Sequence, residues 1–243
     1  YALFAGGNAS SFFVNAVEVY DSSLIKTSAS SLKDARGDIG AVSIGDYAIF
    51  AGGVGSTTYS TVEAYTSSLV KTIISSLHTT KSQATGVSVG GYALFGGGRS
   101  GSTKYNIVEA YNPSLVKSSL SPLSAGMYGM GSASNNTHGL FAGGYANSNI
   151  SVVQAYNTSL VQVTSSSLSV AQQNPAGLSF GEYAVFGGGG LSVDIYDVSL
   201  VKTTLAGISS NRLGMGSAII GNYGLFAGGG YTTTVDVFEK ISA

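Results

Sequence analysis

The most regular arrangement of charged side chains in this sequence is an acidic residue followed eight positions later by a lysine. The pairs are Glu18 and Lys26, Glu63 and Lys71, Glu109 and Lys117, and Asp194 and Lys202, and one further copy has Gln154 and Gln162. A carboxylate could serve in acid–base catalysis. However, both members change to glutamine together in that copy, which is typical of a contact between neighbouring strands. We therefore interpret the pairs as structural, in a hairpin that sets Tyr20 opposite Leu24 and Glu18 opposite Lys26.

Other residues that could carry catalysis are few. The chain has no cysteine and two histidines, His78 and His138, and His138 stands where five related segments have tyrosine. Asp34 and Asp38 lie close together in one segment, and a polysaccharide-degrading enzyme would need such a pair of acids. Catalysis requires convergent acids, bases, nucleophiles or metal ligands. We expect no catalytic residues, metal site or cofactor, and we keep such an enzyme as a third hypothesis.

The composition narrows the classes of partner. Of the 243 residues, 44% are hydrophobic but only 9% are charged, and the formal net charge is −1. This hydrophobic content predicts a folded protein with an uncharged polar surface. A net charge close to zero gives no indication of a basic surface that would bind nucleic acid. No apolar run is long enough for a membrane-spanning helix. We expect no nucleic-acid partner, no membrane insertion, and a location that is extracellular or on a virion surface.

A short apolar run ending in two glycines organises the chain. It reads YAIFAGG from Tyr47 and occurs six times. The copies start at Tyr1, Tyr47, Tyr92, His138, Tyr183 and Tyr223, with spacings of 46, 45, 46, 45 and 40 residues. A period in this range is the signature of a repeat array.

Each repeat contains four strand candidates. In the second copy these are residues 39–45, 47–53, 61–65 and 69–77, separated by turns or polar loops. Four short strands in about 45 residues predict the blades of a β-propeller. We therefore predict one all-β domain over residues 1–243, with six four-stranded blades. The first blade lacks its inner strand and the last its outer strand, which suggests either incomplete end blades or a fragment of a chain that continues at both ends.

These residues resemble the kelch repeat. Its pattern is an apolar strand ending in Gly-Gly, an aromatic residue about a dozen positions later and a hydrophobic fourth strand, matched here by Gly52-Gly53, Tyr65 and Leu69. The resemblance covers nearly the whole chain. Two features depart from it: the chain has no tryptophan, and the basic residue before the first strand survives only as Arg36, Lys81 and Arg212. The resemblance implies a divergent, Tyr/Gly-rich propeller of bacterial or phage type that serves as a binding platform.

The repeats differ most in the loop between the second and third strands. In a four-stranded blade this loop lies on the same side as the connections between blades, and we call that side the variable face. Divergent loops on a rigid scaffold suggest function, although loops under no selection also diverge. Tyrosine combined with Ser, Gly and Asn suits recognition surfaces. Our candidate binding residues are Phe12, Phe13, Arg36, Tyr59, Arg99, Lys104, Tyr105, Tyr145, Arg212 and Tyr231.

Two further hypotheses belong to different classes of function. The first is a non-catalytic binding module that recognises a glycan or a protein through the variable face. The second is a structural or assembly component of a larger particle, such as a virion or a surface complex. The low charge and the incomplete end blades favour contacts with partners in either case.

Overall fold

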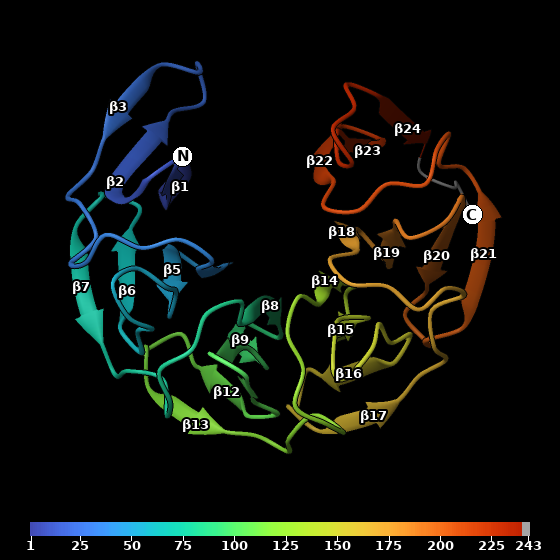
Figure 1. The fold of residues 1–243 in the computed structure, drawn as a ribbon, viewed down its shortest axis with the longest axis horizontal. Helices are drawn as coiled ribbons and strands as arrows, with labels where there is room; N and C mark the ends of the chain where they lie inside the picture. The colour runs from blue at the N-terminus through green and yellow to red at the C-terminus, as the bar shows by residue number, and fades with distance from the viewer. Residues whose placement is uncertain (240–243) are drawn as a thin grey trace.

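The computed structural model describes residues 1–239. Within this range the regular secondary structure consists of β-strands alone. They form small antiparallel sheets set side by side around a ring, as Figure 1 shows. The architecture is a six-bladed β-propeller, which confirms the predicted fold class. The described range holds no helix with the length and apolar character needed to cross a membrane.

Blades 2 to 5 are complete, each with four strands in sequence order. Blade 2 comprises β4 (Gly40–Ile44), β5 (Tyr47–Ala51), β6 (Val62–Thr66) and β7 (Lys71–Ile74). Blade 3 comprises β8 (Thr85–Val89), β9 (Tyr92–Gly96), β12 (Val108–Tyr111) and β13 (Lys117–Ser119). Blade 4 comprises β14 (Gly131–Ser134), β15 (His138–Ala142), β16 (Val153–Asn157) and β17 (Gln162–Thr164). Blade 5 comprises β18 (Ala176–Phe180), β19 (Tyr183–Gly187), β20 (Ser192–Tyr196) and β21 (Lys202–Ala206).

The two end blades have three strands each in the described range, as predicted. Blade 1 comprises β1 (Ala2–Ala9), β2 (Phe12–Tyr20) and β3 (Lys26–Ser28). Blade 6 comprises β22 (Gly216–Ile220), β23 (Tyr223–Ala227) and β24 (Val235–Glu239). Figure 1 shows these blades at the two ends of the ring, on either side of an opening.

Tight turns join the first two strands of a blade. In blade 2, Ile44 pairs with Tyr47 across the turn Gly45-Asp46, and Gly45 has a φ of +49°. Glycine adopts this left-handed conformation without the strain that a Cβ would add. At the other end of β5, the pair Gly52-Gly53 also has positive φ and ends the strand.

The hydrophobic core lies between successive blades. Phe50 and Tyr65 of blade 2 pack edge to face, with ring centroids 5.8 Å apart, against Val17 and Val19 of blade 1. The Tyr65 hydroxyl donates a hydrogen bond of 2.7 Å to the carbonyl of Ser30. The same aromatic pair recurs as Phe95 with Tyr111, Phe141 with Tyr156, and Phe186 with Tyr196. Since each interior sheet is covered on both sides, both of its faces are apolar.

The turn before the fourth strand contains a leucine with positive φ in each of blades 1 to 5. In blade 1 the Asp21 carboxylate accepts hydrogen bonds from the backbone N–H groups of Ser23 and Ile25, at 2.8 and 2.9 Å. These bonds hold Leu24 at a φ of +60°. The equivalent leucines in blades 2 to 5, which also have positive φ, are Leu69, Leu115, Leu160 and Leu200. Each of these four packs against the preceding blade.

The acid–lysine contacts are confirmed, but the predicted register is wrong by two residues. Tyr20 pairs with Lys26, and Glu18 pairs with Ser28. Lys26 therefore reaches Glu18 diagonally across the hairpin, with 2.7 Å between Nζ and Oε1. The turn between Tyr20 and Lys26 contains five residues, 21–25, rather than the three that we assumed, which shifts the pairing, while a long lysine side chain still spans the diagonal.

Candidate binding face

The loops of the variable face are tied to the connections between blades. Isolated antiparallel bridges join Gly37 to Val54, Ser82 to Arg99 and Tyr128 to Tyr145. Each bridge links the connection that enters a blade to the loop after that blade's second strand. The structure thus places both sets of segments on one face, as we expected from topology.

Two cations and two tyrosines gather on this face, across blades 3 and 4. The Arg99 guanidinium lies 4.5 Å from the centroid of the Tyr128 ring, and Lys104 Nζ lies 5.7 Å from that of Tyr145. The two tyrosine rings are themselves 5.5 Å apart and tilted by 46°. We call these four half-buried residues the cation–tyrosine patch. Contacts of a cation with an aromatic face are attractive because the ring carries negative charge density there.

Local structure positions the patch. Arg99 and Lys104 pair with each other across the hairpin of β10 (Arg99–Ser100) and β11 (Thr103–Lys104), which we did not predict. Lys104 Nζ also donates a 2.8 Å hydrogen bond to Asn147 in the loop of blade 4. On the other side of the hairpin, the hydroxyls of Ser100 and Thr58 are 2.8 Å apart. The loops of blades 2, 3 and 4 are therefore linked side chain to side chain.

Sequence reasoning missed Tyr128. We searched the loops after the second strands for aromatic residues, whereas Tyr128 belongs to the connection between blades 3 and 4. The sequence did carry a usable signal. Tyr128 directly follows Met127, which stands at the repeat position of Arg36 and Lys81, and we had already placed that position near the variable face.

We expected Arg36 and Arg212 to be binding residues on the variable face. This expectation was wrong, because neither side chain presents its charge on the surface. Both side chains are buried between blades. Arg36 pairs with Glu63 at 2.7 Å, and Arg212 pairs with Asp236. Lys81 is also buried, beside Glu109, and burial lowers its pKa from the ordinary value. A buried cation needs a partner acid, so the third strand of the next blade supplies one.

The remaining candidates lie outside the patch. Tyr59 is half-buried, with the Arg36 guanidinium 6.0 Å from its ring and its hydroxyl 3.2 Å from that of Ser56. Tyr105 is also half-buried, while Phe12 and Tyr231 are exposed on the end blades. Phe13 is half-buried and packs beside Gly37.

Asp34 and His138, two of the residues that we singled out, each lie close to a neighbouring side chain. Asp34 lies 3.9 Å from the buried Arg36. His138 Nδ1 is 2.8 Å from the Thr137 hydroxyl, and partial burial lowers the pKa of the imidazole. Residues 1–239 contain no group of three or more His, Cys, Asp or Glu that could hold a metal ion.

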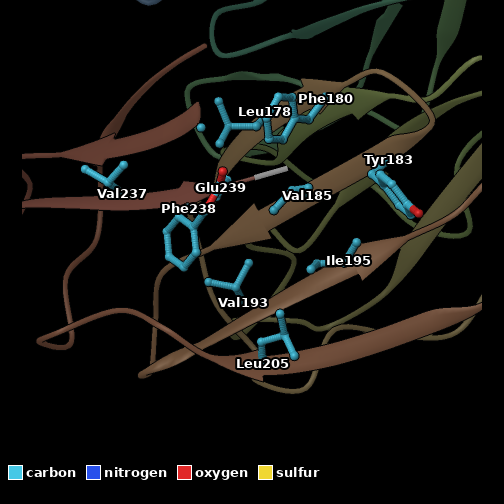
Figure 2. Close-up of a pocket in the computed structure, with 11 residues that line it drawn as sticks. Leu178, Phe180, Tyr183, Val185, Val193, Ile195, Leu205, Val237, Phe238 and Glu239 are labelled. Carbon is cyan, nitrogen blue, oxygen red and sulfur yellow. The ribbon is translucent and has the colours of Figure 1, made fainter. Parts of the chain in front are cut away.

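An apolar pocket of about 240 Å³ lies between blades 5 and 6. Figure 2 shows Leu178, Phe180 and Tyr183 on one side and Val237 and Phe238 on the other. The residues at the positions of Leu178, Phe180 and Tyr183 in blade 3 are Val87, Val89 and Tyr92, and they pack against the turn leucine Leu160 of blade 4. In blade 3, a side chain of the following blade thus occupies the place that corresponds to this pocket. We therefore assign the pocket to packing between blades rather than to a ligand.

Comparison with known proteins supports the fold alone. No protein-family model matches the sequence, and no curated protein matches it. Among solved structures, the chain is similar to one described as the structure of YjhT, with a TM-score of 0.70 and 11% sequence identity. The similarity covers 96% of this chain and 92% of that one. At this identity, the likeness extends to the propeller architecture and not to the ligand.

Proposed function

We propose that this protein is a non-catalytic binding module that recognises a glycan or a protein partner through the variable face. The observation that carries the proposal is the cation–tyrosine patch. Arg99, Lys104, Tyr128 and Tyr145 come from three separate segments, and nothing in the blade scaffold requires such side chains to meet.

The chemistry of the patch suits recognition. Tyrosine rings can stack on sugars or on apolar side chains, and they lose little conformational entropy when they bind. A guanidinium held over a ring still presents N–H groups at its edge to carboxylate, sulfate or hydroxyl acceptors. Hydrogen bonds between the loops hold these groups in place before a ligand arrives, which reduces the entropic cost of binding.

We place the chain, again as a proposal, among divergent kelch-like propellers on the strength of its Gly-Gly, tyrosine and leucine pattern. Its low charge favours an extracellular or virion-surface location. A second candidate function is a structural role in a larger particle. Exposed apolar side chains on both end blades favour it, notably Phe4, Leu24 and Val237.

The test is binding by variants of the patch. The wild-type protein is screened against a glycan array and, by pull-down, against surface proteins, and any hit is measured by calorimetry. We expect Arg99→Ala and Tyr145→Ala each to weaken binding about tenfold or more, because removing an interface anchor costs more than about 1 kcal/mol. Circular dichroism confirms that the variants fold.

Glu182→Gln is the matched control, because Glu182 is exposed in a turn on the opposite face. It should bind like the wild type. If Arg99→Ala and Tyr145→Ala also bind normally, the patch is not the site. Loss of particle assembly on removal of β1 or β24, with the patch dispensable, would instead support the structural role.

A further inference from the structure

Most cations of this chain have an acidic partner, whereas the two cations of the cation–tyrosine patch have none in the described range. The chain has 11 lysines and arginines, of which ten lie in residues 1–239. Seven of these ten form a salt bridge with an aspartate or glutamate of the same range. The other three are Lys33, Arg99 and Lys104. Two of the three therefore lie together in the patch.

Arg99 and Lys104 face each other across the hairpin of β10 and β11. They are direct cross-strand partners. Side chains at directly paired positions extend from the same face of a two-stranded ribbon, and like charges placed there destabilise it. The outer hairpins of blades 2 and 3 have the opposite arrangement, since Lys71 and Lys117 each approach an acid of the adjacent strand, at 3.4 and 3.2 Å. A local arrangement that costs stability is typical of a functional site.

The segments that surround the patch contain no acid. They are the loops after the second strands of blades 2 to 4 and the connections into blades 3 to 5, which span residues 54–60, 78–83, 99–106, 124–130, 145–149 and 169–175. Lys81, in one of these connections, is buried beside Glu109. The solvent-accessible positive charge of this part of the variable face therefore comes from Arg99 and Lys104, and no acid of these segments offsets it.

Both cations have hydrogen-bond donors to offer to a ligand. Lys104 Nζ carries three N–H groups and donates one to Asn147. The Arg99 guanidinium carries five in a planar fork, which matches the two oxygens of a carboxylate. The rings of Tyr128 and Tyr145 hold the two charged groups, with 4.5 Å from Arg99 to the first centroid and 5.7 Å from Lys104 Nζ to the second. The patch is thus arranged before an anion arrives.

The surroundings of the cations favour a glycan over a protein as the source of the anion. A protein partner needs an apolar centre in the interface. However, the loops 99–106 and 145–149 contain a single aliphatic side chain, Ala146. Apart from cations and tyrosines, their other residues are serine, threonine, asparagine and glycine. The hydroxyl and amide groups of such residues hydrogen-bond to sugar hydroxyls, and tyrosine rings stack on sugar rings.

We propose that the patch binds an anionic glycan, with a sulfate or carboxylate group of the glycan between Arg99 and Lys104. This inference rests on the proposed function and names the class of its ligand. The anion offsets the repulsion between the two like charges of the hairpin. It also accepts charge-assisted hydrogen bonds, which are stronger than those of a neutral sugar hydroxyl. Tyr128 and Tyr145 supply ring surface for the sugar.

The test compares charged and neutral glycans that are otherwise alike. One pair of probes is the hexasaccharide of galacturonic acid and its methyl ester, and the other is sulfated maltohexaose and maltohexaose. Isothermal titration calorimetry at low ionic strength measures their binding. We expect the wild type to bind at least one charged probe about tenfold or more tightly than its neutral counterpart, because the neutral probe forms no charge-assisted bond. This binding should weaken as salt is added, since salt screens exposed charges.

Variants assign the binding to the two cations. Arg99→Gln and Lys104→Gln each remove one charge and keep a side chain that hydrogen-bonds, and each should weaken binding of the charged probe about tenfold or more. Lys33→Gln is the matched control. It removes the same charge from the third cation without a salt bridge in residues 1–239, which is exposed in the connection between blades 1 and 2. It should bind the charged probe like the wild type, and circular dichroism checks that all three variants fold.

Equal binding of charged and neutral probes overturns the inference. Charged-probe binding that Arg99→Gln and Lys104→Gln leave unchanged, or that Lys33→Gln weakens equally, overturns it too. A hexaglutamate peptide is the last arm, and tighter binding of this peptide through the same two cations would make the ligand an acidic peptide and the glycan class wrong. Absence of binding to both charged probes also overturns the inference, whereas the proposed function is judged separately by the glycan array and Tyr145→Ala.

Discussion

Arg36 and Glu63 form a buried ion pair, 2.7 Å long, that joins the connection out of blade 1 to the third strand of blade 2. The same two repeat positions are taken by Lys81 and Glu109, by Met127 and Gln154, by Gln172 and Asp194, and by Arg212 and Asp236. Where the acid becomes Gln154, the cation becomes Met127, and the two side chains still meet at 4.0 Å. The chain thus contains its own neutral version of the pair.

This relationship predicts how the pair responds to mutation. Arg36→Met alone leaves the Glu63 carboxylate buried with the more distant Lys71 as its one charged partner among the described residues, and should cost about 3–5 kcal/mol of unfolding free energy. The double variant Arg36→Met with Glu63→Gln reproduces the Met127–Gln154 pair and should be markedly more stable than the single one. Urea denaturation measures both. A double variant as unstable as Arg36→Met would show that the site needs the ionic pair itself.

The sequence predicted the scaffold well, since the scaffold is repeated. Six copies of an apolar run ending in Gly-Gly defined the blades, and the joint change to Gln154 and Gln162 identified the acid–lysine contact. Register was harder to predict. A leucine in a left-handed conformation, such as Leu24, is unusual, and the turn that contains it holds two more residues than the residue pattern suggested.

The candidate site was predictable only in part, because a site is made where the repeats differ. Arg99, Lys104 and Tyr145 were found by their divergence, but their contact with Tyr128 depends on how two loops from adjacent blades fold. We predicted Arg36 to be exposed because it is a basic residue in a polar connection, but its side chain is buried. Its acid partner lies 27 residues away in the sequence, so local pattern could not reveal the pair.

Alkaline pH should destabilise the fold through its buried tyrosines. Burial raises the pKa of Tyr65, Tyr111, Tyr156 and Tyr196 above the ordinary value of 10.0. A folded-state pKa above the unfolded one means that the neutral form is favoured in the folded protein. This stability is fully present below pH 10 and is lost progressively as the pH rises above it.

Two measurements check this. Absorbance titration at alkaline pH should show these four tyrosines ionising only as the protein unfolds. Tyr111→Phe should cost about 1 kcal/mol at neutral pH, since it removes the hydrogen bond to Ser75. It should also flatten the loss of stability above pH 10. Ionisation of these four tyrosines near pH 10 while the protein is still folded would contradict their burial.

The two kinds of glycine in a blade should respond differently to the same substitution. Gly45 and Gly52 both have positive φ, at +49° and +66°. A Cβ added at Gly45 meets nothing within 4 Å, so Gly45→Ala should cost only the left-handed strain of about 1–2 kcal/mol. A Cβ at Gly52 would lie 2.5 Å from the carbonyl oxygen of Lys81. Gly52→Ala must therefore also displace the connection between blades 2 and 3, and should cost more than Gly45→Ala. Thermal unfolding measures the loss of stability in the two variants. An equal loss in both would mean that the connection between blades 2 and 3 moves without cost, so that Gly52 is needed only for its positive φ.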